Sequence, residues 1–135
     1  MKPLTEKQKQ KARIAIAKDV INHLPDLNVT HGSYFDSTTR LPKTGDARNY
    51  IDKLRKCEVC VLGCMMVSFI DKYNSVKMED FTHDFLHWAI IKCKLGEIFA
   101  DFQLDDIERH FEDFGWSIKD IMENIITNEG TFVGR

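Results

Sequence analysis

The stretch from Cys57 to Ile70 constrains the fold more than any other, because only Glu58, Gly63 and Ser68 interrupt its apolar residues. A helix that is apolar on nearly every side must be buried on nearly every side. We therefore predict that this stretch forms the central helix of a mainly α fold. The expected architecture is a single-domain bundle of five or six helices around this buried helix, with at most a minor two-stranded β-ribbon.

The length of the chain predicts a single globular helical domain over residues 1–135. Residues 1–8 are expected to be partly flexible. Residues 25–45 are rich in turn-forming Pro, Gly, Asn, Asp and Ser, so an irregular loop is expected there. Loops of ~20 residues are uncommon in compact domains and are often functional. A surface meander without function is the alternative.

Helical spacing of apolar residues predicts helices on both sides of the central stretch. Thr5 and Gln8 have the form of a capping box, and Pro25 ends the helix of about 5–24 that follows. Further helices are expected over residues 47–54 after Asp46, over 79–95, over 104–114, and after Ser117.

Two phenylalanines at the ends of one predicted helix are expected to pack inward. Phe102 is expected to help dock the connection that enters the helix. Phe114 continues the three- and four-residue spacing of Leu104, Ile107 and Phe111, which predicts a common buried side.

Two short segments have the composition of strands. Residues 33–36 lie within the irregular loop, and residues 131–133 form a β-prone tail. We predict that these two segments pair as the minor ribbon.

Three cysteines, Cys57, Cys60 and Cys64, would share about 60° of arc on a continuous helix. One zinc ion cannot bind all three there, because Cys57 and Cys64 would be about 10.5 Å apart along the axis. The metal alternative is the pair Cys57 and Cys60 with two further ligands from elsewhere, such as His31, His83 or His87. We expect the thiols to pack as small apolar groups, and we assign no metal ligand and no cofactor.

Catalytic alternatives also involve the thiols. A thioredoxin-like CxxC pair follows a strand, which residues 52–56 do not resemble. A Cys–His pair whose members are distant in sequence stays open, with Cys57 as the candidate because Arg55 and Lys56 precede it. No catalytic residue is assigned.

The net charge of −2 gives no indication of direct nucleic-acid binding, but the charges are unevenly distributed. Residues 97–129 include ten acidic residues and only two basic ones, Arg109 and Lys119. Asp105, Glu108 and Glu112 are therefore candidates for a negative surface that orients a partner.

No apolar run reaches the ~18 residues of a membrane span. The N-terminus lacks the features of a signal peptide, and four cysteines without one favour free thiols in the cytoplasm.

Two groups of residues resemble a family of small uncharacterised bacteriophage and prophage accessory proteins. The first is Cys57-Glu-Val-Cys60-Val-Leu-Gly63, with Gly32-Ser-Tyr34 ahead of it. The second comprises Ile98-Phe99, Gln103-Leu104, Ile107-Glu108, Phe111-Glu112 and the run from Met122 to Phe132. Cys64 departs from the pattern, which tends to have a small residue there. The resemblance covers about two-thirds of the chain in patches. It implies a viral or mobile-element setting in the host cytoplasm, and no established activity comes with it.

Two hypotheses of function follow. The first is an accessory protein that binds, and thereby inhibits, a host or phage protein such as a defence complex; association with further copies of itself is compatible with this. The second is a protein that sequesters a small molecule, or a small thiol- or His-dependent enzyme, with a pocket beside residues 28–48. That pocket would use His31, Tyr34, Arg40 and Arg48.

Overall fold

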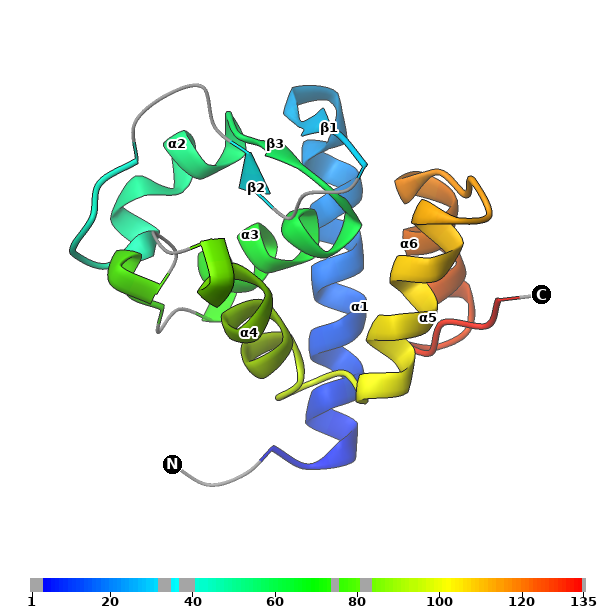
Figure 1. The fold of residues 1–135 in the computed structure, drawn as a ribbon. Helices are drawn as coiled ribbons and strands as arrows, with labels where there is room; N and C mark the ends of the chain where they lie inside the picture. The colour runs from blue at the N-terminus through cyan, green and yellow to red at the C-terminus, as the bar shows by residue number, and fades with distance from the viewer. Residues whose placement is uncertain (1–3, 32–34, 37–40, 74–75, 81–83, 135) are drawn as a thin grey trace.

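The longest helix, α1 (Glu6–His23), begins at the predicted capping box. The computed structural model describes residues 4–31, 35–36, 41–73, 76–80 and 84–134. The Gln8 N–H donates to Thr5 Oγ1 at 3.1 Å, and the Thr5 N–H donates to Gln8 Oε1 at 2.9 Å. Pro25 lies in the short 3₁₀ turn η1 (Leu24–Asp26), which ends the helix as predicted. Figure 1 shows α1 standing between the α3–α4 side of the molecule and the α5–α6 pair.

The central position of the apolar stretch is confirmed. Helix α3 (Val61–Tyr73) contains ten consecutive buried residues, from Val61 to Ile70. It contacts α1, α4, α5 and the short helix α2 (Ile51–Arg55). The structure thus surrounds the part of α3 from Val61 to Ile70 on all sides, as its composition predicts.

The helix begins later than predicted, because Cys57 and Cys60 flank a strand. Strand β3 (Glu58–Val59) lies at the centre of a three-stranded sheet. It pairs in parallel with β1 (Asn28–Val29) and antiparallel with β2 (Phe35–Asp36). The prediction of a helix from Cys57 was wrong, since a short apolar run can be strand or helix and its periodicity alone does not decide. The pairing of residues 33–36 with residues 131–133 was also wrong, because β2 pairs with β3 instead.

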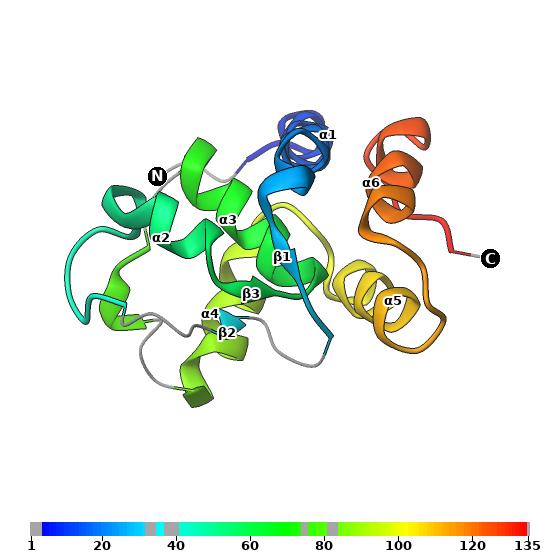
Figure 2. The ribbon, with the colours of Figure 1, turned by 90° about the horizontal axis from the view of Figure 1, so that it is seen from above.

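The remaining elements confirm the mainly α fold class, with six α-helices among the described residues. Beyond those already given, they are η2 (Ala47–Tyr50), η3 (Met78–Asp80), α4 (Asp84–Leu95), α5 (Asp101–Glu112) and α6 (Ile118–Thr127). The predicted caps are present, because Asp46 Oδ1 accepts from the Arg48 N–H and Ser117 Oγ accepts from the Asp120 N–H. Seen from above, α5 and α6 lie together at one edge of the molecule (Figure 2).

The last residues of the chain fold back between α5 and α6. Glu129 and Gly130 have positive φ angles of 56° and 92° and reverse the chain after α6. Residues 131–134, which we call the C-terminal segment, then lie against two side-chain amides. The Gln103 amide donates to the Phe132 carbonyl at 3.0 Å and accepts from the Phe132 N–H at 2.7 Å. The Asn124 amide makes the same two bonds with Val133, both at 2.8 Å.

Candidate functional site

The predicted acidic residues lie along one side of α5. Asp101, Asp105, Glu108 and Glu112 are spaced by four, three and four residues, and we call them the acidic stripe. The Asp105 side chain is 71% exposed and accepts from Lys92 Nζ of α4. Glu108 and Glu112 are half-buried. The three predicted residues therefore share one helix side, on a helix at the edge of the molecule (Figure 2).

Two large apolar side chains are exposed at the ends of α5. Phe102 is 70% exposed and Phe114 is 59% exposed, so the prediction that both pack inward was wrong. Phe102 lies away from the side of α5 that carries Leu104 and Ile107. Phe114 lies beyond the end of the helix, where Gly115 turns with a φ of 72°. Helical spacing therefore no longer applies at Phe114.

The predicted group beside residues 28–48 is brought together only in part. The His31 ring stacks on the Phe111 ring of α5, with centroids 4.1 Å apart and planes 7° from parallel. Arg48 has a different neighbour, because its Nε donates to the Ile70 carbonyl of α3 at 3.3 Å. Tyr34 and Arg40 lie outside the described residues. His31 therefore adjoins the helix of the acidic stripe.

The three thiols near α3 are shielded from solvent. Cys57, Cys60 and Cys64 are at most 2% exposed. Burial raises the pKa of the Cys60 thiol to about 11 and raises the pKa of Cys64 further. Cys93 on α4 is exposed. A protonated, buried thiol is a poor nucleophile, so Cys60 and Cys64 behave as packing groups.

We expect iodoacetamide to add to one thiol per native chain at about pH 8, because one of the four thiols is exposed and three are buried. That thiol is Cys93, and Cys93→Ser is expected to abolish the rapid reaction. Intact-mass spectrometry over time measures the adducts, with a denatured sample as the control in which all four thiols react. Rapid addition of any group to the folded Cys93→Ser variant would contradict the burial of the other three thiols and favour the thiol-enzyme hypothesis.

The metal alternative receives no new support from the geometry. Among the described residues no group of three or more His, Cys, Asp and Glu side chains is placed to hold a metal ion. His83, one of the predicted ligands, lies outside the described residues.

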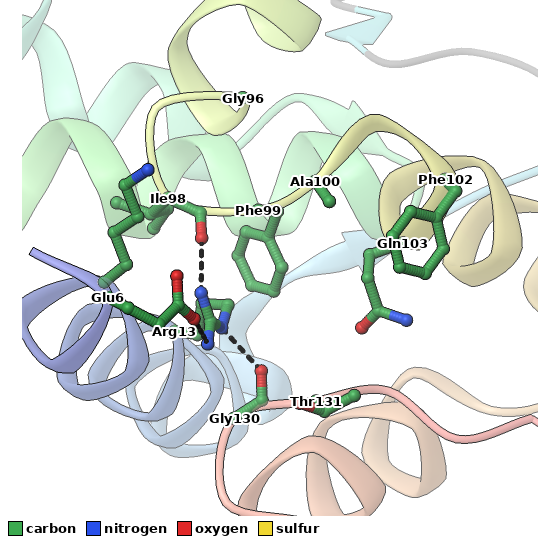
Figure 3. Close-up of a pocket in the computed structure, with 11 residues that line it drawn as sticks. Glu6, Arg13, Gly96, Ile98, Phe99, Ala100, Phe102, Gln103, Gly130 and Thr131 are labelled. Carbon is green, nitrogen blue, oxygen red and sulfur yellow. Dashed lines mark hydrogen bonds and ion pairs between the residues drawn. The ribbon is translucent and has the colours of Figure 1, made fainter.

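A cavity of about 260 Å³ lies at the N-terminal end of α1. Its lining comes from the first turns of α1, from the connection between α4 and α5 together with the first turn of α5, and from Gly130 and Thr131 (Figure 3). Lys9 and Arg13 bring positive charge, and Phe99 and Phe102 bring aromatic surface. The cavity thus lies in a different place from the pocket predicted beside residues 28–48.

Arg13 organises this cavity, and sequence reasoning missed its role. Its Nε donates to the Gly130 carbonyl at 2.7 Å, its Nη1 to the Ile98 carbonyl at 2.8 Å, and its Nη2 to the Glu6 carboxylate at 2.8 Å. Its side chain is only 11% exposed. The available signal was its spacing, because Arg13 lies four and seven residues before the buried Ala17 and Val20.

Comparison with known proteins adds no relative: no family model, no curated protein and no solved structure matches the chain. Within the described part of the chain, none of the helices has both the length and the apolar character that crossing a bilayer requires.

Proposed function

We propose that the protein acts by binding another protein through α5, without catalysis. The observation that carries the proposal is the exposure of Phe102 and Phe114 at the two ends of this helix. Aromatic side chains are enriched at protein interfaces, where a few buried anchors supply much of the binding energy. A partner that covers α5 would remove both rings from water.

The charge of α5 indicates the chemistry of the partner. The helix carries the acidic stripe and Asp106, and Asp113 follows it. Lys92 pairs with Asp105, and Arg109 pairs with Asp106 at 2.7 Å, so the surface stays net negative. A basic protein surface would be attracted and oriented by this field. The partner we propose is therefore a protein with a Lys- or Arg-rich surface.

The biological setting in this proposal comes from the resemblance to bacteriophage and prophage accessory proteins. A small phage-encoded protein with a negative, aromatic surface is suited to cover a basic site on a host protein or defence complex. Inhibition would then follow from occupation of that site, which requires no chemistry from the buried thiols.

The test compares proteins retained from a bacterial lysate by the immobilised wild type and by Phe114→Ser. A true partner is retained by the wild type at about 0.15 M salt and is released as higher salt screens the charges. The immobilised Phe114→Ser variant does not retain this partner. With the purified partner, calorimetry is expected to show a dissociation constant at least about tenfold higher for the variant, the effect of an interface aromatic.

The matched control is Tyr73→Ser, which removes an aromatic side chain of similar exposure, 44%, from the end of α3. It should retain the partner as the wild type does. Equal binding by Phe114→Ser and the wild type, or equal losses in both variants, would overturn the assignment to α5.

A further inference from the structure

The cavity beside α1 has two unlike halves. Two cationic residues of α1, Lys9 and Arg13, are among the residues that line it, and the guanidinium of Arg13 lies on the α1 side (Figure 3). On the other side lie Phe99, which is 2% exposed, and Phe102, which is 70% exposed at the rim. Such a combination of a few charged groups with apolar walls is typical of sites for small organic ligands.

The guanidinium of Arg13 is fixed in position by two backbone carbonyls. Its bonds to the Ile98 and Gly130 carbonyls tie it to the α4–α5 connection and to the turn after α6. Its third acceptor is different, because the Glu6 carboxylate belongs to a side chain that is 77% exposed. The structure therefore holds a cation that two carbonyls fix in position and whose carboxylate partner is exposed to water.

Glu6 shows that a carboxylate fits at Arg13 Nη2. The hydrogen bond from Arg13 and the charges of Arg13 and Lys9 lower the pKa of Glu6, so its carboxyl is ionised at neutral pH. The Glu6 side of this ion pair is in contact with water, so its carboxylate contributes little stability and can exchange with another. A carboxylate from outside can take the place of Glu6 without breaking the two bonds that hold the arginine.

We propose that this cavity binds a small monocarboxylate with an aromatic or similarly apolar body. Its carboxylate replaces that of Glu6 on Arg13 and also pairs with Lys9. Its apolar body lies between Phe99 and Phe102, which covers the exposed ring of Phe102. In the absence of the ligand, Glu6 occupies the carboxylate position and acts as a competitor within the chain.

The proposal predicts opposite changes in ligand affinity for substitutions of Glu6 and of Lys9. Glu6→Gln removes the competing charge and is expected to tighten binding roughly threefold. Lys9→Gln removes an attractive charge and is expected to weaken binding by roughly the same factor. Phe102→Ala removes one apolar wall and also weakens binding. A cavity with a purely structural role would show none of these changes.

The probe is 3-phenylpropionate, titrated at millimolar concentration into the full chain and followed by amide chemical shifts in NMR. Millimolar affinity is the range expected of a ligand with so few atoms. The neutral amide of the same acid is the control for the charge, and Lys11→Gln, on an exposed lysine of the same helix, is the control for nonspecific attraction.

Saturable shifts around Arg13 and Phe99 with the acid but not the amide, tighter in Glu6→Gln and weaker in Lys9→Gln, would support the site. Equal binding of acid and amide, unchanged affinity in Glu6→Gln, or no shifts at all would overturn it. Glu6 and Lys9 lie on α1, so their variants leave α5 intact. Failure here is therefore distinguishable from failure of the partner-binding proposal, which Phe114→Ser tests.

Discussion

Phe132→Ala is expected to lower the free energy of unfolding by about 3–5 kcal/mol, although the residue lies close to the end of the chain. The Phe132 side chain is 2% exposed. Its ring meets the edges of the His110 and Trp116 rings, with centroids 5.0 and 5.6 Å away. Truncation would leave a cavity lined by rings that cannot collapse into it, because backbone and side-chain contacts hold them. Thermal unfolding should show a midpoint lowered by about 10–20 °C.

The neighbouring residue provides the control for this prediction. Val133 is half-buried, and its backbone makes the same type of paired bonds to an amide as that of Phe132. Val133→Ala keeps those bonds and is expected to cost less than about 1.5 kcal/mol. If Phe132→Ala cost no more than Val133→Ala, the C-terminal segment would contribute to stability through its backbone alone.

Met66→Ala is the second change with a large expected effect, a loss of about 2–5 kcal/mol. Met66 lies in the middle of α3 and has no exposed surface. Alanine favours a helix, so the loss reports only the missing contacts and the cavity that remains. Chemical denaturation measures it as a lower midpoint with an unchanged slope.

Tyr73→Ala, at the exposed end of the same helix, is the matched control. Its side chain is 44% exposed, so the expected loss is below about 1 kcal/mol. Equal losses in the two variants would contradict the central position of α3.

Features that depend on neighbours in sequence were predicted well. The caps at Thr5, Asp46 and Ser117 each involve residues two or three positions apart, so the sequence contains both partners of each bond. The burial of Val61–Ile70 was also predictable, because no side of that helix is suited to water.

Features that depend on distant partners were missed. Cys57 and Cys60 flank a strand because residues 28–29 and 35–36 supply its hydrogen-bonding neighbours. The C-terminal segment bonds to the side-chain amides of Gln103 and Asn124, so it does not form the predicted ribbon. In each case the bond forms between segments that only folding brings together.

The candidate sites show the same difference between what the sequence predicts and what requires the structure. Asp105, Glu108 and Glu112 could be placed on one helix side from their spacing, and the structure places them there. Their role in binding stays a prediction. The exposure of Phe102 and the cavity around Arg13 required the structure, because the cavity walls come from three segments far apart in the chain.

The amino-acid sequence alone determined a mainly helical protein with a dry helix near its middle, since periodicity and capping act within a few residues. Tertiary structure decided which aromatic rings remain in water, where the last residues dock and where a cavity opens. These depend on which surfaces meet, and contacts between distant segments leave no periodic signal in the sequence.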